Sequence, residues 1–304
     1  MELMFFNYCY REIKIYLKAA RLDHWFKNIF MLIGAIGGIA YSKVPIGETV
    51  VFHTAVAFLL TCLISSVNYI VNEIVDARYD KVHPNKKLRP VASGIISTEK
   101  LVYLVTILLF ISLSISYIAF NGEFFLLMIL FFVTGGIFYN IPPIRTKDLP
   151  YFDIISESVN NPIRLLLGWN AVNSPSDIPL IAIVSYWSLG AALVTAKRWA
   201  ELRFLGEKSV HFRPTFGYYS GSSLTLMYFF YMVTTIVTFI LLSVKYKNQL
   251  LYFTPFVLIF FIWLTFLTIQ KNSVIKEPER IFEKKGFVLY CLLSFLVLTG
   301  TLFL

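Results

Sequence analysis

The sequence predicts an all-α, multi-pass membrane protein, and its composition and its apolar segments support this fold class. Of its 304 residues, 57% are hydrophobic and only 15% are charged, whereas soluble domains carry about 25% charged residues. Continuous apolar stretches recur along the chain, and about 20 such residues cross a bilayer as a helix. The stretches do not alternate between apolar and polar residues, so a transmembrane β-barrel is not expected.

The first 27 residues differ in character from the rest of the chain. Basic residues, among them Arg11, Lys14 and Lys18, are mixed with aromatic and aliphatic residues. This part contains no apolar core long enough for a signal peptide. We therefore expect an amphipathic helix on the membrane surface over residues 1–27, and a single transmembrane helical domain over residues 28–304.

Nine apolar segments follow, and we interpret each as a membrane span. Their boundaries are expected to be accurate to about 2–4 residues. The fifth segment is the least apolar, because several polar residues interrupt it. The segments are 28–46, 50–75, 99–120, 123–141, 152–172, 178–198, 220–244, 250–270 and 286–304.

The distribution of basic residues predicts the orientation in the membrane. Most of the 27 Lys and Arg residues precede the first span or lie in the connections after spans two, four, six and eight. Basic connections stay in the cytoplasm, so the N-terminus is expected inside and the C-terminus outside. The same rule accounts for the net charge of +9 without a nucleic-acid partner. Function is expected on the cytoplasmic side, where the connections are long and polar.

Acidic residues gather at the end of the second span. Asn72, Asp76 and Asp80 are four residues apart, so a helix places all three on one face, with Glu73 beside them. Carboxylates near the end of a membrane helix are costly unless they are paired or bind a cation. Oxygen ligands of this kind suit Mg²⁺, which proteins usually hold with one or two carboxylates plus substrate phosphates.

A basic stretch follows directly after Pro84. Lys86, Lys87 and Arg89 could neutralise phosphate oxygens through charge-assisted hydrogen bonds. The alternative is a solvated helix end that carries the ordinary positive charge of a cytoplasmic loop. Three polar groups on one face, followed at once by the basic stretch, favour a binding site.

The fifth span carries a polar stripe. Asp153, Glu157, Asn161 and Arg164 step by four, four and three residues, so they follow one side of a helix into the bilayer. Ionisable residues at such a depth are candidates for a functional site. The alternative is an internal network that only locks helices together. Pro162 is expected to kink this span and to free a backbone carbonyl.

A third polar stretch, A-K-R-W-A-E-L-R, ends the sixth span over residues 196–203. Lys197 and Glu201 are four residues apart and can form an ordinary helix pair. The basic residues Lys197 and Arg198 are equally compatible with a membrane anchor and with a phosphate site.

The run over residues 72–94 resembles the signature of the UbiA superfamily of intramembrane prenyltransferases, N-D-x-x-D-x-x-x-D followed by R-P-x-x-x-G. Glu73 replaces the usual Asp. Residues 21–28 (R-L-D-H-W-F-K-N) resemble the opening segment of the family, and residues 139–147 (Y-N-I-P-P-I-R-T-K) resemble its motif after the fourth helix. The resemblance implies a bundle of nine helices around a lipid-facing central cavity. The matching signature residues are Asn72, Asp76, Asp80, Arg89, Pro90 and Gly94.

The loop after the sixth span separates two branches of that family. Aromatic prenyltransferases carry a second acidic motif there, whose carboxylates serve two Mg²⁺ ions, but this chain has Lys197 and Arg198. Basic residues at this place, together with H-P-x-K-x-x-R-P over residues 83–90, resemble the decaprenyl-phosphate phosphoribosyltransferase branch. The stretch P-P-I-R-T-K is closer to the branches that use prenyl diphosphates. Asp153 and Glu157 could also supply a second metal site from a different helix.

The resemblance thus implies a Mg²⁺-dependent transferase that displaces pyrophosphate, most consistent with phosphoribosyl transfer to a polyprenyl phosphate. Prenyl transfer to an aromatic or polar acceptor is the alternative, and a transporter is disfavoured because no inverted repeat is evident. The expected partners are the polyprenyl lipid, the diphosphate-bearing donor and membrane lipids. A homo-oligomer is also compatible with the sequence. The expected location is a bacterial inner membrane. We assign metal binding to Asn72, Asp76 and Asp80, with Glu73 as a further catalytic residue; phosphate binding to Lys27, Lys86, Arg89, Lys197 and Arg198; and substrate orientation to Tyr139, Lys147, Asp153, Glu157, Asn161, Arg164 and Glu201.

Overall fold

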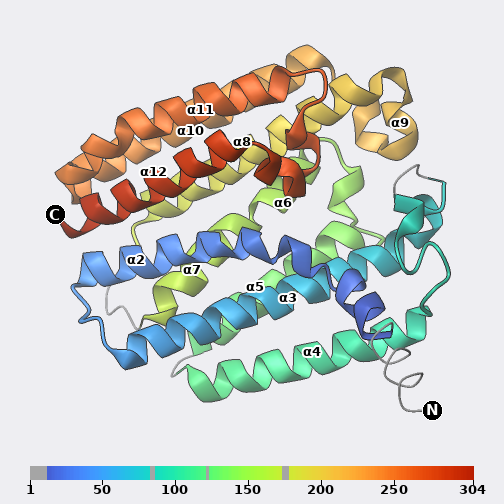
Figure 1. Cartoon of the computed structure of the whole chain (residues 1–304), viewed down its shortest axis with the longest axis horizontal. Helices are drawn as coiled ribbons and strands as arrows, with labels where there is room; N and C mark the ends of the chain where they lie inside the picture. The colour runs from blue at the N-terminus through green and yellow to red at the C-terminus, as the bar shows by residue number, and fades with distance from the viewer. Residues whose placement is uncertain (1–11, 83–85, 121–122, 173–177) are drawn as a thin grey trace. The chain divides into compact units, whose positions relative to one another are not determined.

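The computed structural model describes residues 12–82, 86–120, 123–172 and 178–304. All regular secondary structure in these residues is helical (Figure 1), which confirms the predicted all-α class. The chain divides into two compact units. Unit 1 comprises the described part of Met1–Ile29 together with Ala55–Arg145, and unit 2 comprises Phe30–Thr54 and Thr146–Leu304.

Among the described residues, seven helical segments are long and apolar enough to cross a membrane. The other two of the nine expected spans are not single long helices, because each is divided into two shorter helical pieces. Residues 28–46 form the end of a 3₁₀ helix, η1 (Leu22–Phe30), and the 12-residue helix α2 (Met31–Ser42). Residues 152–172 form two short helices, so the count of nine stays a prediction. The seven segments are Glu48–Asp80, Thr98–Ala119, Glu123–Asn140, Leu180–Leu205, Gly221–Tyr246, Asn248–Ile269 and Lys285–Phe303.

Unit 1 is built on the long helix α3 (Glu48–Asp80), of which residues 55–80 belong to it, with α4 (Thr98–Ala119) and α5 (Glu123–Asn140). The Asn68 side chain donates a hydrogen bond of 2.9 Å to the carbonyl of Phe132 and so joins α3 to α5. Small residues let membrane helices approach closely, and Gly136 has this role, since a Cβ there would meet the Asn68 amide.

The N-terminal segment is helical over residues 12–19 and contributes to the apolar core of unit 1. Ala19 is fully buried, and this cluster also contains Ile70 of α3 and Leu101 of α4. This helical, partly buried segment is compatible with the expected surface helix, whose membrane position stays a prediction. Residues 1–11 of the expected helix lie outside the described residues.

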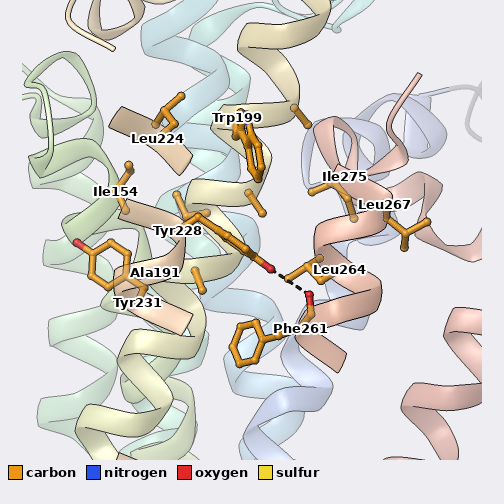
Figure 2. Close-up of a cluster of buried hydrophobic side chains, with 14 of the residues drawn as sticks. Ile154, Ala191, Trp199, Leu224, Tyr228, Tyr231, Phe261, Leu264, Leu267 and Ile275 are labelled. Atoms are coloured by element: carbon orange, nitrogen blue, oxygen red, sulfur yellow. Dashed lines mark hydrogen bonds between the residues drawn. The ribbon is translucent and has the colours of Figure 1, made fainter. Parts of the chain in front are cut away.

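Unit 2 contains α2, α6 (Phe152–Ser158), α7 (Asn160–Ala171), α8 (Leu180–Leu205), α9 (Ser209–Phe212), α10 (Gly221–Tyr246), α11 (Thr254–Ile269) and α12 (Lys285–Phe303). Helices α8 and α10 lie side by side (Figure 1). Their shared core is rich in aromatic residues, and Figure 2 shows Trp199, Tyr228 and Phe261 meeting within it. The Tyr228 hydroxyl shares a 2.9 Å hydrogen bond with Thr265, so its polar end is satisfied inside the core.

A kink was expected in the fifth span, and the structure has a one-residue interruption of the helix at Val159, between α6 and α7. Pro162 has no backbone N–H, so the carbonyl of Ser158, four residues earlier, cannot receive its helical hydrogen bond. The side-chain amide of Asn161 donates to that carbonyl instead, at 3.2 Å. The proline therefore interrupts the helix, and the residue beside it satisfies the freed carbonyl.

Helices α2 and α7 approach each other through two glycines. A Cβ on Gly34 would clash with the carbonyl of Leu165, and a Cβ on Gly168 would clash with the carbonyl of Met31. Each glycine thus faces the backbone of the opposite helix. The close approach depends on both of them.

We predict that Gly34→Val and Gly168→Val each destabilise unit 2. Overpacking of a tight contact typically costs about 1–3 kcal/mol, so thermal unfolding in detergent should begin at a lower temperature. Gly300→Val in α12 is the matched control, because a Cβ there meets no atom within 4 Å. Equal unfolding temperatures for all three variants would contradict the proposed role of the contact.

Candidate functional site

The acidic face of unit 1 lies on the last turns of α3. Because α3 is unbroken from Glu48 to Asp80, Asn72, Asp76 and Asp80 do share one side of the helix, as the spacing predicts. Asp80 is only 3% exposed, and Asn72 and Asp76 are partly buried. A carboxylate this buried requires a cationic partner.

Arginines supply that partner to both aspartates. Arg89 forms an ion pair with Asp80. Arg145 reaches Asp76 at 2.9 Å and donates a second hydrogen bond, of 3.0 Å, to the carbonyl of Asn140 at the end of α5. Each guanidinium comes from a connection rather than from α3 itself. The acidic face therefore lies beside two fixed positive charges.

Glu73 holds the basic connection in place. Its carboxylate is 1% exposed and accepts a 3.0 Å hydrogen bond from the backbone N–H of Val91. Gly94 closes the same loop with a φ of 75°, a conformation that favours glycine. Glu73 thereby fixes the loop that carries Arg89. Its expected part in catalysis stays a prediction.

The segment over residues 21–28 adds further cations to unit 1. The Arg21 guanidinium lies 5.7 Å from the centre of the Tyr69 ring, and Lys27 is 2.8 Å from the imidazole of His24. Burial, followed by the charge of Arg89, lowers the pKa of Arg21. Two arginines within electrostatic reach of each other form a positively charged environment that suits an anion.

Three further residues predicted to bind or orient substrate are found as follows. Lys86, in the short 3₁₀ helix η2 (Lys86–Leu88), and Tyr139, in the last turn of α5, are both partly buried. Lys147 belongs to unit 2 and is 6% exposed. His83, which the resemblance included, lies outside the described residues.

The donor set on α3 fits Mg²⁺. Two carboxylates and an amide supply hard oxygen ligands, which Mg²⁺ prefers. Within the described parts of the chain, no three His, Cys, Asp or Glu side chains are grouped closely enough to hold a metal by themselves. Asp80 and Asp76 are paired with Arg89 and Arg145, so Mg²⁺ binding by these residues together with substrate phosphates stays a prediction.

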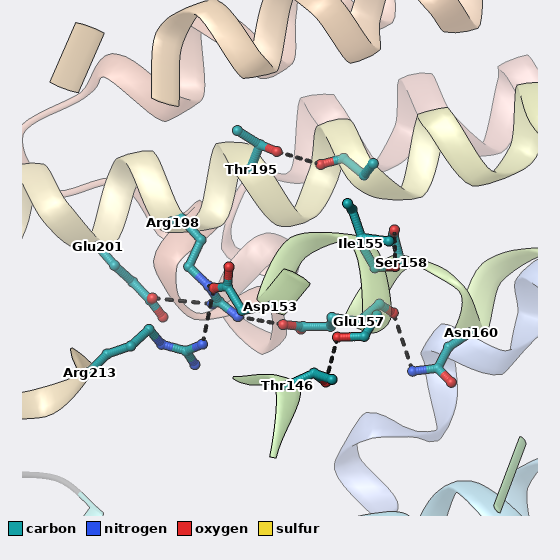
Figure 3. Close-up of polar contacts among 12 residues, drawn as sticks. Thr146, Asp153, Ile155, Glu157, Ser158, Asn160, Thr195, Arg198, Glu201 and Arg213 are labelled. Carbon is teal, nitrogen blue, oxygen red and sulfur yellow. Dashed lines mark hydrogen bonds and ion pairs between the residues drawn. The ribbon is translucent and has the colours of Figure 1, made fainter. Parts of the chain in front are cut away.

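Unit 2 contains a second cluster, centred on Arg198 of α8 (Figure 3). Arg198 has no exposed side-chain surface. Its guanidinium pairs with Asp153 at 3.2 Å, with Glu157, and with Glu201 at 3.3 Å. These contacts join α6 to α8. They give Arg198 an organising role, whereas its predicted direct contact with phosphate stays untested.

Two further residues, Arg213 and Tyr219, contact the Asp153 carboxylate. Arg213 approaches it at 3.5 Å, and the Tyr219 hydroxyl donates a 2.5 Å hydrogen bond to Asp153 Oδ1. The same hydroxyl accepts a 2.6 Å hydrogen bond from the backbone N–H of Tyr151. Burial, together with the hydrogen bond to Asp153 and its charge, raises the pKa of Tyr219. Tyr219 therefore remains a proton donor to the carboxylate.

The cluster is buried on one side and accessible on the other. The side chains of Asp153 and Arg198 are 0% exposed, whereas those of Glu157, Glu201 and Arg213 are 28%, 23% and 21% exposed. The inner pair fixes the geometry. The outer side chains retain surface that a polar ligand can reach.

The remaining residues of the polar stripe predicted on the fifth span contact other parts of the protein. Asn161 bonds the carbonyl freed by Pro162 and packs where Gly190 leaves room on α8. Arg164 is 8% exposed, and it donates a 3.3 Å hydrogen bond to the carbonyl of Asn160. Lys197 is partly buried on α8. Substrate contacts by Asn161, Arg164 and Lys197 stay predictions.

Sequence reasoning missed Arg21, Arg145, Arg213 and Tyr219 as site residues. Arg21 and Arg145 lie inside segments that were recognised as motifs, so the basic residues there offered a signal. Arg213 and Tyr219 lie in the polar connection between α8 and α10, where no spacing pattern marks them. Only the folded chain brings them to Asp153.

The fold and the two clusters define a class: a multi-pass helical membrane protein whose buried carboxylates are held by arginines. Comparison with known families then gives the relationship. The model of the UbiA prenyltransferase family matches residues 30–297. The chain belongs to this family, which is a family of transferases.

Two curated relatives are about a quarter identical to this chain over the regions that match. A decaprenyl-phosphate phosphoribosyltransferase of Corynebacterium glutamicum is 25% identical over 61% of this chain and 54% of its own length. The protein of that name from Mycolicibacterium smegmatis is 27% identical over 70% of this chain and 64% of its own length. The matches thus span between about half and two thirds of these relatives.

Solved structures share the fold. A UbiA homologue from Archaeoglobus fulgidus, bound to GPP and Mg²⁺, superposes with a TM-score of 0.67 at 18% identity, covering 94% of this chain and 99% of that one. The same homologue bound to DMAPP and Mg²⁺ gives a TM-score of 0.68 at 17% identity, covering 93% and 99%. At this identity the likeness establishes the UbiA fold alone.

We predict that Tyr219→Phe destabilises unit 2. The change removes the hydrogen bond to the Asp153 carboxylate and the acceptor of the Tyr151 N–H, and a buried partner left unsatisfied costs about 1–3 kcal/mol. Tyr218→Phe, at a neighbouring side chain that is 71% exposed, is the control. Thermal unfolding in detergent should separate the two variants, and indistinguishable curves would show that Tyr219 does not hold the cluster.

Proposed function

We propose that this protein is a Mg²⁺-dependent transferase that moves a 5-phosphoribosyl group from phosphoribosyl pyrophosphate to a polyprenyl phosphate. The relatives from Corynebacterium and Mycolicibacterium support the proposal by name. We further propose that it acts at the cytoplasmic face of a bacterial inner membrane, in line with its basic connections.

The observation that carries this proposal is the arrangement around Arg198. The carboxylates of Asp153, Glu157 and Glu201 all contact its guanidinium. They are therefore already neutralised in part, and one fully buried guanidinium holds all three at once. Partly exposed carboxylate oxygens are good acceptors for sugar hydroxyls. We assign Glu157 and Glu201 to orienting the ribose, with Asp153 fixed behind them.

Binding of the donor diphosphate is assigned to unit 1. Asn72, Asp76 and Asp80 would hold Mg²⁺ together with diphosphate oxygens, and the ion would supply charge neutralisation to the leaving group. Arg89 and Lys86 are placed on the connection that follows the acidic face. They would contact phosphate oxygens as charge-assisted donors.

The proposed reaction is a displacement at the C1 carbon of the ribose. An oxygen of the acceptor phosphate forms the new bond to C1 while the bond from C1 to the diphosphate oxygen breaks, and pyrophosphate leaves with that electron pair. No protein group needs to transfer a proton, since the attacking oxygen is already ionised. Positioning and electrostatic stabilisation by the protein then provide most of the rate.

Prenyl transfer from a polyprenyl diphosphate to an aromatic or polar acceptor is the second candidate. The family match and the A. fulgidus homologue with bound GPP favour it. The acidic face of α3 would serve this reaction equally well. The two candidates differ in what the cluster around Arg198 must bind.

Turnover with defined substrates distinguishes the candidates. Purified protein in detergent, with Mg²⁺, labelled phosphoribosyl pyrophosphate and a polyprenyl phosphate, is expected to yield labelled lipid. A parallel reaction contains a polyprenyl diphosphate and an aromatic acid. Product in the second reaction alone would refute phosphoribosyl transfer.

We predict that Asp76→Asn lowers turnover by about 100-fold or more, as removal of a key electrostatic contact commonly does. The amide has a similar shape but cannot neutralise Mg²⁺. Glu48→Gln, an exposed carboxylate in the first turn of the same helix, is the control and should retain full activity. Unchanged turnover in a folded Asp76→Asn protein would exclude the metal assignment.

A further inference from the structure

A groove of about 500 Å³ lies on unit 1 between the end of α3 and the start of α4. Its lining includes Arg78 and Lys81 from α3 and Ser97 and Thr98 from α4. Apolar side chains such as Ile74 complete the wall. The groove therefore combines two cations and hydroxyl groups with apolar side chains.

This groove is separate from the acidic face of α3. Helical residues advance by about 100°, so Ile74 and Arg78 lie roughly opposite Asp76. None of the three predicted metal-binding residues lines the groove. A ligand bound here would not contact the acidic face on the other side of α3.

The positive charge of the groove is not neutralised by acidic residues. In the described parts of the chain, neither Arg78 nor Lys81 forms an ion pair with a carboxylate. Arg78 stacks over the Tyr79 ring at 4.6 Å and donates one hydrogen bond, of 2.8 Å, to its hydroxyl. A guanidinium has five N–H donors, so others remain for a ligand.

The position of the groove along the helices indicates its depth in the membrane. Helix α3, a candidate span, ends at Asp80, and α4, the next candidate span, begins at Thr98. The groove thus lies where the ends of two candidate spans meet, and we expect this level to coincide with the lipid headgroups. Basic pockets between transmembrane helices at this level bind anionic headgroups.

We infer that this groove binds the phosphodiester headgroup of an anionic membrane phospholipid. Arg78 and Lys81 contact the phosphate, the hydroxyl of Thr98 donates to it, and apolar lining side chains such as Ile74 contact the glycerol and upper acyl carbons. A phosphodiester carries one negative charge, which two cations neutralise without a metal ion. The groove also adjoins Val91, whose N–H is held by Glu73, so a bound lipid would stabilise the loop that carries Arg89.

Lipid retention tests this inference without any substrate. The full chain in neutral detergent is incubated with phosphatidylglycerol or phosphatidylcholine, and bound lipid is counted by native mass spectrometry. Wild type should retain phosphatidylglycerol at least about tenfold better than phosphatidylcholine. Equal retention of the two lipids would overturn the inference.

Substitutions in the groove locate the binding. Arg78→Gln with Lys81→Gln should abolish the preference, whereas Lys14→Gln with Lys100→Gln removes the same charge from exposed positions of unit 1 outside the groove and should retain it. A preference unchanged by the groove pair would overturn the assignment.

A second substitution guards against a folding defect. Thr98→Glu places a negative charge in the groove, yet an acidic residue is favourable in the first turn of a helix. It should abolish the preference, and Thr98→Gln, which is neutral and of similar size, should keep it. A folded Thr98→Glu protein that retains phosphatidylglycerol normally would refute the site.

Competition identifies the source of the phosphate. Neither inorganic phosphate nor a polyprenyl phosphate, at the concentration of phosphatidylglycerol, should displace the bound lipid. Displacement by inorganic phosphate would assign the groove to a free anion, and displacement by polyprenyl phosphate would assign it to the acceptor lipid. Either result would overturn the assignment to a phospholipid.

Discussion

The pairing of buried carboxylates with arginine is the constraint on which both units depend. A carboxylate removed from water is strongly destabilising unless a cation and hydrogen bonds compensate it. Asp80 and Asp153 are 3% and 0% exposed, and each has an arginine partner from a different element. The ion pairs therefore fix the connection after α3 in unit 1, and they fix α6 against α8 in unit 2. Local architecture and candidate chemistry rest on the same contacts.

The break between α6 and α7 follows from a second constraint, the missing N–H of Pro162. A continuous helix there would leave the Ser158 carbonyl unsatisfied in an apolar environment, where such a group is costly. Asn161 satisfies it locally, so the chain tolerates the interruption. Because α6 ends here, Asp153 and Glu157 belong to a separate short helix whose carboxylates reach Arg198.

Local patterns in the sequence predicted what depends on local geometry. The four-residue spacing of Asn72, Asp76 and Asp80 places them on one face of any unbroken helix. Pro162 predicted the interruption of its own helix, because proline has no backbone N–H. Patterns could not predict pairs such as Arg145 with Asp76, because contacts between residues far apart depend on how the elements pack. The sequence could not predict the contacts of Arg198 with three carboxylates for the same reason. The interruptions within residues 28–46 and 152–172 depend on local backbone geometry that composition does not show, and whether these two segments cross the membrane stays a prediction.

The charge balance around Arg198 bears on the choice between the two reactions. A guanidinium stays protonated at every accessible pH, so Arg198 and Arg213 place two permanent cations beside Asp153, Glu157 and Glu201. A divalent ion added there would be repelled by both cations, as it would be by Arg89 and Arg145 beside Asp80 and Asp76. Around Arg198 it would in addition have to displace ion pairs that hold α6 to α8. Hydroxyl groups of a sugar face no such opposition, since they can donate to the outer carboxylate oxygens while the ion pairs persist. This cluster therefore favours a donor that presents hydroxyls over one that requires a second metal.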